Sequence, residues 1–207
     1  MERVEALDIC GRCGGYCCLH VPGRLIPHDL SADEPLTEQV IHDALDSKRA
    51  VVFSSFINIG RSKTVPVFTL AARGVNRPPL SLAYEPTRCY HLLGERCAFS
   101  LELRPFECAM MVPAGEISRC GMPDDMLIEP YWVKYQDLLR TVIETRSGLS
   151  WRDEVMRQLE TRCKKDDYAN AMLTLVKSRG LAHDAHEADA IIASWIETLP
   201  EVDRAAV

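Results

Sequence analysis

Residues 10–18 read CGRCGGYCC, a stretch that places four thiols within nine residues. Few physical roles use such a density of thiols other than holding a soft metal centre. Two residues between Cys10 and Cys13 let both sulfurs face one point, and the glycines of the stretch supply the backbone freedom that such a loop needs. Neighbouring side chains of an extended chain point to opposite faces, so either Cys17 or Cys18 faces elsewhere or the two serve different metal atoms. The stretch therefore predicts a metal-binding loop.

A second group of cysteines, Cys89, Cys97 and Cys108, follows far along the chain. Seventy residues separate Cys18 from Cys89, so a site that joins the two groups closes only when the chain folds. The cost of closing a loop grows by roughly 0.6 kcal/mol for each doubling of its length. Structural metal binding contributes roughly 10–16 kcal/mol in small zinc peptides. A shared metal would therefore hold the fold together.

The order and spacing of these cysteines resemble those of a known bacterial family. Residues 10–18 form a block Cys-x2-Cys-x3-Cys-Cys, and residues 89–108 form a block Cys-x7-Cys-x10-Cys that ends in Arg-Pro-x-x-Cys. Over residues 8–112 the chain resembles the YkgJ-type cysteine-cluster family of zinc- or iron-chelating proteins, a domain of which also occurs in the flagellin lysine methylase. The family commonly has two residues before the cysteine pair and an arginine where Ala109 stands. The resemblance implies metal binding.

Two kinds of thiolate centre are compatible with the spacing. A zinc ribbon usually joins two CxxC knuckles, and the second block contains none. A ferredoxin run reads Cys-x2-Cys-x2-Cys-x3-Cys, which the first block approaches without matching. Because the thiols of the two blocks exceed the needs of one tetrahedral zinc, we expect an iron–sulfur cluster, of the [4Fe-4S] type, with zinc as the alternative. The candidate ligands are Cys10, Cys13, Cys17, Cys18, Cys89, Cys97 and Cys108.

Other side chains near the two blocks are candidates for supporting roles. Deprotonated thiols accumulate negative charge, which the guanidinium of Arg104 is suited to offset, unless Arg104 is a surface residue before a turn. His20 and His91 are able to replace a thiol, as histidine does in mixed sites, but we expect ordinary polar neighbours. Cys120 lies outside the family-like block. Cys163 stands alone on a predicted helix, where we expect a buried or surface thiol.

Charge and hydropathy restrict the partners. The chain has 24 basic and 30 acidic residues, a formal net charge of −6, and no long basic run to follow a phosphate backbone, so nucleic acid is not expected. No apolar run reaches the roughly 18–20 residues of a membrane span, and residues 1–7 lack the layout of a signal peptide. Nine cysteines is an odd number, which favours metal ligation over disulfides. We therefore expect a cytoplasmic protein without a membrane partner.

The residue patterns predict an α+β fold. Residues 1–122 are expected to form a small cysteine-rich β and turn platform, and residues 123–207 a mainly helical region packed on it, or both together a single domain. Residues 65–70 and 80–84 are rich in strand formers, and we expect them to pair as an antiparallel ribbon. Residues 51–60 are apolar but aperiodic, which leaves helix and strand both open.

Helical periodicity first appears over residues 36–48, where Ser31 or Asp33 is the candidate N-cap. Four further apolar stripes with short connections follow. They predict helices over about 125–145 behind an Asp124-Asp125 cap, over 151–162 behind Ser150, around 168–176 with its end at Gly180, and around 191–199 with its end at Pro200.

No catalytic motif accompanies the cysteines. The chain lacks a GxSxG elbow, a phosphate loop, a dinucleotide fingerprint, an HExxH pair and the CxxxCxxC run of radical enzymes. Two classes of function therefore remain. One is a metal-binding module whose centre stores, delivers or senses metal or simply crosslinks the fold. The other is a methyltransferase-like metalloenzyme of protein modification. In both cases the helical region supplies a surface for a substrate or a protein partner.

Overall fold

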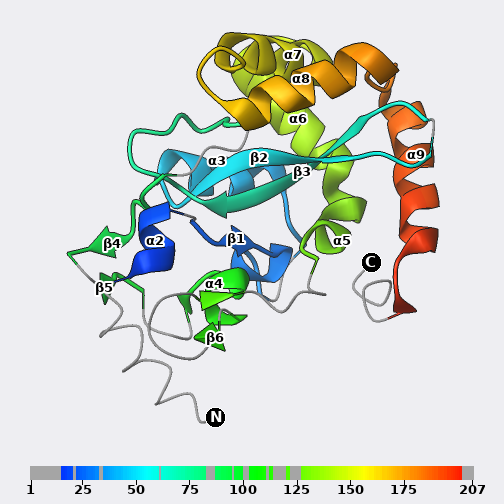
Figure 1. Ribbon diagram of the computed structural model, residues 1–207. Helices are drawn as coiled ribbons and strands as arrows, with labels where there is room; N and C mark the ends of the chain where they lie inside the picture. The colour runs from blue at the N-terminus through cyan, green and yellow to red at the C-terminus, as the bar shows by residue number, and fades with distance from the viewer. Residues whose placement is uncertain are drawn as a thin grey trace.

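The structure is a computed structural model that describes residues 15–20, 22–32, 35–60, 62–82, 87–94, 96–99, 103–110, 112–113, 120–121 and 127–201. It has an α+β architecture, in which helices of the second half cover a three-stranded antiparallel sheet (Figure 1). The short helices and strands that carry cysteines gather near one end of this sheet. The predicted fold class is therefore confirmed.

The sheet has the strand order β1-β3-β2. Strand β2 (Ala50–Ile57) pairs with β3 (Val65–Ala72) along its whole length. Strand β1 (Arg24–Leu25) pairs with the C-terminal end of β3. The predicted ribbon of residues 65–70 with 80–84 is wrong, because residues 51–57 are the nearer strand and a short connection brings them alongside β3. Leu80 instead forms a parallel bridge with Val52 of β2.

Two glutamine side chains supply hydrogen bonds to backbone groups that have no neighbouring strand, one to Phe68 of β3 and the other to the segment 80–82. The amide of Gln136 accepts from the N–H of Phe68 at 2.9 Å and donates to its carbonyl at 2.8 Å. The amide of Gln158 accepts from the N–H of Leu82 at 2.8 Å and donates to the carbonyl of Leu80 at 3.3 Å. Both glutamines are buried, so each keeps backbone groups satisfied in places that water does not reach.

The first long helix, α3 (Glu38–Asp46), confirms the helix predicted over residues 36–48. Its N-cap is Thr37, whose hydroxyl accepts from the N–H of Val40 at 3.4 Å. Ser31 is not the cap, and Asp33 lies outside the described residues. Thr37 directly follows Leu36, the first apolar residue of the stripe, whereas Ser31 lies five residues before Leu36.

The helix predicted over residues 125–145 is divided. It consists of α5 (Glu129–Trp132), a 3-10 turn η3 (Val133–Tyr135) and α6 (Gln136–Ser147), which ends at Gly148. The division lies between Trp132 and Gln136, whose side chains bond to the backbones of two different strands of the sheet. The predicted cap at residues 124–125 lies outside the described residues.

The last three helices confirm their sequence patterns. Helix α7 (Trp151–Arg162) starts at Ser150, whose hydroxyl accepts from the N–H of Asp153 at 3.2 Å. Helix α8 (Asp167–Arg179) ends at Gly180, and α9 (Ala185–Thr198) ends before Pro200. Within the described ranges, no helix has both the length and the apolar character needed to cross a bilayer.

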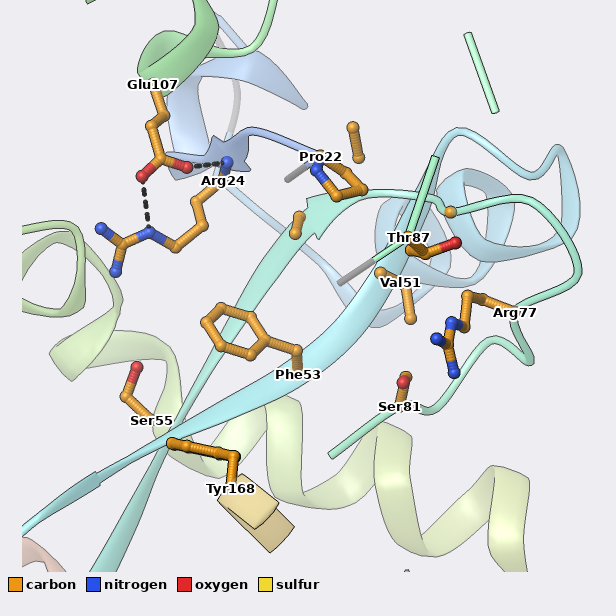
Figure 2. Close-up of a pocket in the computed structure, with 13 residues that line it drawn as sticks. Pro22, Arg24, Val51, Phe53, Ser55, Arg77, Ser81, Thr87, Glu107 and Tyr168 are labelled. Carbon is orange, nitrogen blue, oxygen red and sulfur yellow. Dashed lines mark hydrogen bonds and ion pairs between the residues drawn. The ribbon is translucent and has the colours of Figure 1, made fainter. Parts of the chain in front are cut away.

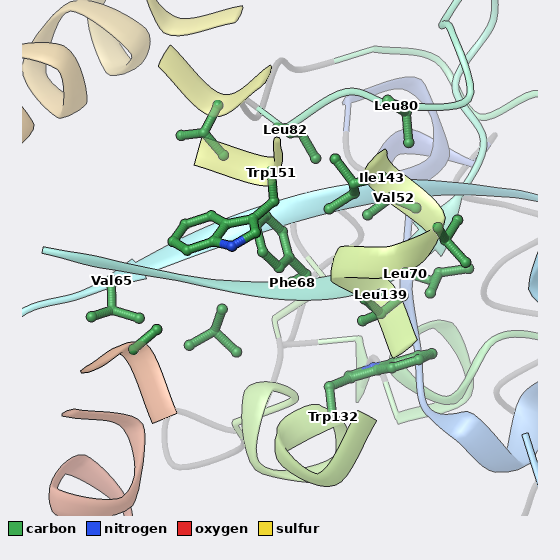
Figure 3. Packing of buried hydrophobic residues seen from close by; sticks show 14 of the residues in the cluster. Val52, Val65, Phe68, Leu70, Leu80, Leu82, Trp132, Leu139, Ile143 and Trp151 are labelled. Atoms are coloured by element: carbon green, nitrogen blue, oxygen red, sulfur yellow. The ribbon is translucent and has the colours of Figure 1, made fainter. Parts of the chain in front are cut away.

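One main core joins the sheet to the helices. Figure 3 shows Val52 and Phe68 of the sheet facing Ile143 of α6 and the indole of Trp151. The rings of Phe68 and Trp151 meet edge to face, with centroids 6.0 Å apart. The same core continues from Leu25 of β1 to residues of α9, so residues before and after position 122 bury their apolar faces against each other.

An ion pair between the buried Glu154 and the exposed Arg157 of α7 makes the stability of this region depend on pH. The carboxylate of Glu154, which is 2% exposed, accepts two hydrogen bonds from Arg157 and one from Gln158. The bonds from Arg157 are the main reason that the pKa of Glu154 lies below its ordinary value of 4.5. The unfolded chain therefore binds the proton more tightly than the folded chain does. The stability from this pair is present above pH 4.5 and is lost as the pH falls further.

We expect Arg157→Ala to lower the free energy of unfolding at neutral pH and to have less effect as the solution becomes acidic. The reason is that a protonated Glu154 no longer gains from the guanidinium. Urea unfolding of both proteins from about pH 7 to about pH 3 measures the difference. A difference that stays constant over this range would contradict the role of the ion pair.

Candidate metal centre and adjoining pocket

The end of the first cysteine block forms the short helix α2 (Tyr16–His20). Gly15 precedes it with a φ of 72°, a left-handed conformation that favours glycine. The glycine of the predicted loop therefore has the role expected of it. Cys17 and Cys18 lie in this helix and not in the extended chain that the sequence argument assumed. The side chain of Cys17 lies outside the described part of the structure, so the expectation that one of the two faces elsewhere, or that they serve different metal atoms, stays a prediction.

The two cysteine blocks meet between Cys18 and Cys89. The N–H of Cys89 donates to the carbonyl of Cys18 with an N–O distance of 2.6 Å. The side chain of Cys18, half-buried, packs against a small buried cluster formed by Ala72, Cys89 and Leu92, in which Cys89 is 5% exposed. We call these four residues the cysteine cluster. It joins segments that are separated by 70 residues of sequence.

Cys97 lies next to the cysteine cluster through a short strand pair. Strand β5 (Arg96–Cys97) pairs with β4 (Leu92–Leu93), and Cys97 stands opposite Leu92. The N–H of Leu92 donates in turn to the carbonyl of Cys89 at 3.2 Å. Turn and strand geometry thus return Cys97 toward Cys89.

Cys108 approaches the same end of the sheet from helix α4 (Phe106–Met110). Its sulfur occupies the space in which a side chain of Gly23 would stand, since a Cβ built on Gly23 would lie 2.1 Å from Sγ of Cys108. The carbonyl of Gly23 accepts from the N–H of Ala72 at 2.8 Å, which connects Cys108 to the cysteine cluster by one intervening residue.

The complete ligand set stays a prediction. Among the residues that the structure describes, no three Cys, His, Asp or Glu side chains are close enough together to hold a metal ion. Cys10 and Cys13 lie outside those residues, and only the backbone of Cys17 is described. The described part of the site is therefore the pair Cys18 and Cys89, with Cys97 and Cys108 in the adjacent segments.

The other residues that the sequence analysis considered beside the metal ligands lie in different parts of the structure. The ring of His91 lies against Phe99, and its Nε2 lies 3.2 Å from the carbonyl oxygen of Arg49. Burial lowers the pKa of His91, so its ring is neutral at pH 7. Arg104 is half-buried just before α4, and its role beside a metal stays a prediction. Cys163, the C-cap of α7, is partly buried against the main core, and the expectation that it is no ligand stays a prediction.

His20 and Cys120 complete the set that the sequence singled out. His20 is the last residue of α2, where it is exposed and its carbonyl accepts from the N–H of Thr87 at 3.0 Å. Cys120 lies in β7 (Cys120–Gly121), which pairs with β6 (Val112–Pro113). Neither position changes the candidate ligand set.

A pocket of about 310 Å³ opens beside the cysteine cluster (Figure 2). Its apolar wall consists of Val51 and Phe53 of β2 with Ala71 and Ala72 of β3. Ala72 also belongs to the cysteine cluster, so one residue separates the pocket from Cys89. Val51 pairs with Ala71, whereas the next pair, Val52 with Leu70, faces the main core. The pocket therefore lies on the side of this strand pair opposite to Val52 and Leu70.

Arg24 lines one end of this pocket and forms ion pairs with two buried carboxylates. Its Nε donates to Glu107 at 3.0 Å, its backbone N–H donates to the same carboxylate, and its Nη1 donates to Glu129 at 2.8 Å. The hydroxyl of Ser55 donates to Glu129 at 2.6 Å. These bonds connect β1, β2, α4 and α5. Among the described residues, two carboxylates bind one guanidinium here, which is an excess of negative charge.

Tyr168 of α8 also lines the pocket (Figure 2). Burial is the main cause that raises the pKa of its hydroxyl, and the negative charges of Glu129 and Asp166 act in the same direction. The hydroxyl therefore keeps its proton at neutral pH.

Sequence reasoning missed the pocket and its charged end. The alternation of Val51, Phe53 and Ser55 on one face of β2 is the local signal that could have indicated it. No comparable signal connects Arg24 with Glu107 and Glu129, since these residues are far apart in the chain.

Comparison of the chain with protein-family models, curated proteins and solved structures finds no match. The fold and the site define an α+β protein with a cysteine-rich end and an adjoining pocket. The resemblance to the YkgJ-type family rests on the cysteine spacing and stays a prediction.

We expect Gly23→Ala to destabilise the protein by about 1–3 kcal/mol, because the added methyl group would overlap Sγ of Cys108. Urea unfolding measures the loss. The double variant Gly23→Ala, Cys108→Ala is the matched control, since it removes the sulfur that the methyl group meets. Equal costs in the presence and absence of the Cys108 sulfur would contradict this packing.

Proposed function

We propose that this protein holds a cysteine-ligated metal centre, with an iron–sulfur cluster of the [4Fe-4S] type as the first choice and zinc as the alternative. The proposal is supported chiefly by the contact between Cys18 and Cys89, which brings the two cysteine blocks together across 70 residues. A fold that needed only an apolar cluster at this end would have no use for so many thiols in the adjacent segments. The protein is expected in the cytoplasm, where thiols stay reduced.

The chemistry of the donors fits such a centre. Thiolates are the ligands that both iron–sulfur clusters and structural zinc prefer. Ala72 and Leu92 surround Cys89 with apolar groups, which limits access of water to the sulfur. The guanidinium of Arg88 donates to the carbonyl of Leu92 at 3.1 Å and provides a positive charge in the same segment. A bound cluster would supply one-electron exchange, whereas zinc would supply a crosslink.

Anaerobic purification followed by analysis of iron, acid-labile sulfide and zinc tests the proposal. We expect about four irons and four sulfides per chain. One zinc per chain without sulfide would favour the alternative, and a chain without either metal would overturn the proposal. Cys89→Ala is expected to lose most of the metal, while Cys163→Ala serves as the matched control that keeps it, because Cys163 packs in the main core.

The pocket favours a second candidate function, a metalloenzyme of protein modification that is methyltransferase-like. A cavity of about 310 Å³ shares Ala72 with the cysteine cluster, so a substrate group in the pocket would lie beside the metal. Incubation of the metal-loaded protein with cell extract and a methyl-labelled donor tests this function. Label transfer that is lost in Ala71→Leu would support it. If the label is transferred equally well by Ala71→Leu, or if no label is transferred at all, the metal-binding module is the remaining function.

A further inference from the structure

The pocket beside the cysteine cluster has the size and the lining of a site for a small molecule. Its volume of about 310 Å³ falls at the lower end of the range of about 300–1,000 Å³ that ligand pockets have. Val51 and Phe53 form its apolar wall together with Ala71, whose methyl group leaves room for a flat ring. We propose that this pocket binds a small neutral aromatic molecule, whose ring lies against the wall and whose N–H or O–H group donates a hydrogen bond to the carboxylate of Glu107.

The polar groups at the Arg24 end of the pocket present acceptors to such a molecule. Ser55 donates its hydroxyl proton to Glu129 at 2.6 Å, so the lone pairs of its Oγ remain for a ligand. Figure 2 shows the two bonds that Glu107 accepts, one from Nε and one from the backbone N–H of Arg24. A carboxylate has about four lone-pair sites, and in the described part of the chain Arg24 occupies one on each oxygen of Glu107. Glu107 therefore has room for one more donor, which the ligand supplies.

The charges at this end favour a neutral ligand over an ionised one. Glu107 is 5% exposed, so water and salt screen little of its repulsion toward an anionic group. The guanidinium of Arg24, whose Nε lies 3.0 Å from the same carboxylate, repels an ammonium group in the same way. A neutral N–H or O–H group avoids both repulsions and still forms a charge-assisted hydrogen bond with the carboxylate.

The carboxylate of Glu107 is oriented before a ligand arrives. Glu107 lies in α4, and its two bonds to Arg24 join it to β1. Arg24 in turn pairs with Ala71 in the sheet, so the same residue holds the wall and the acceptor in register. An acceptor that is already fixed loses little freedom when the ligand binds. Because neither Glu107 nor Ser55 is a candidate metal ligand, this binding does not rest on the proposed metal centre.

NMR titration of the full chain with indole tests the proposal, and benzofuran is the matched probe, since it has nearly the shape of indole but no N–H group. We expect saturable binding of indole, with shifts of the backbone amides of Val51, Phe53 and Ala71. Benzofuran should bind at least about tenfold more weakly, because it makes no hydrogen bond to the carboxylate. Absence of saturable binding at millimolar indole would overturn the proposal, and so would equal binding of the two probes by the wild type.

Two variants connect this binding to the pocket. Ala71→Leu fills the space in front of the wall and should weaken binding of indole by about tenfold or more. Ala193→Leu makes the same change on the exposed surface of α9 and should leave binding unchanged. Glu107→Gln should reduce the difference between indole and benzofuran severalfold, because a neutral amide is a weaker acceptor than a carboxylate. Full affinity of Ala71→Leu for indole, or an unchanged difference in a Glu107→Gln variant that circular dichroism shows to be folded, would contradict the proposal.

Discussion

Replacement of Arg24 by methionine is expected to lower the free energy of unfolding by about 3–5 kcal/mol. The side chain of Arg24 is 22% exposed, and the carboxylates that it binds, Glu107 and Glu129, are 6% and 9% exposed. Methionine keeps the apolar stem but leaves two carboxylates in a place that water hardly reaches. Removing one partner of a buried ion pair costs more than the pair itself contributes, because the remaining charge is not compensated.

Urea unfolding at pH 7 measures this effect. Arg146→Met is the matched control, because its partner Asp46 is 67% exposed, and we expect a loss of about 0–1 kcal/mol there. Adding Glu107→Gln to Arg24→Met should restore part of the stability, since it removes one of the uncompensated charges. A cost for Arg24→Met no larger than that of the control would contradict the network. The metal content of the variant should also fall, because Glu107 and Cys108 share helix α4.

The helices of this protein could be predicted because their signals are local. Ser150 before α7 and Gly180 after α8 lie within a turn of the elements that they end, so the sequence near them contains the whole cause. The division of the helix at Val133–Tyr135 escaped prediction for the opposite reason. It depends on where Trp132 and Gln136 bond to the sheet, which no local pattern shows.

The pairing of the strands was the part of the fold that the sequence described worst. Residues 65–70 and 80–84 both favour strand, and propensity alone does not choose between them and residues 51–57 as neighbours. The observed register, in which Val51 pairs with Ala71 and Val52 with Leu70, places the first pair at the pocket and the second in the main core. Long-range pairing of this kind depends on the whole core.

The candidate site also has one part that the sequence indicated and another that only the fold shows. The spacing of the cysteines predicted that the two cysteine blocks share one site. The structure brings Cys18 against the cluster that contains Cys89, and the shared ligand set stays a prediction. The spacing said nothing of the pocket, since Arg24, Glu107 and Glu129 are single charged residues in three distant segments. Cysteines are rare enough to be recognised as a group from the sequence, whereas arginine and glutamate are common, and only the fold shows which of them meet.

Replacement of Gln136 by leucine is expected to cost about 2–5 kcal/mol of stability, even though leucine is the more apolar residue at a site that is 2% exposed. The amide of Gln136 bonds to both the N–H and the carbonyl of Phe68, and it donates to the carbonyl of Trp132 at 3.0 Å. Leucine would leave the N–H and the carbonyl of Phe68 without partners in the core. Each buried backbone group in this state costs about 1–3 kcal/mol.

Urea unfolding measures the total loss, and hydrogen exchange of the Phe68 amide locates it. Gln39→Leu is the matched control, since its amide bonds to Asp43 on the exposed surface of α3 and should change stability by less than about 0.5 kcal/mol. A variant as stable as the wild type, with a protected Phe68 amide, would show that another group takes the place of the glutamine. If the amide exchanges faster while the other amides of β3 stay protected, Gln136 acts as the missing strand neighbour that keeps this part of the sheet closed to water.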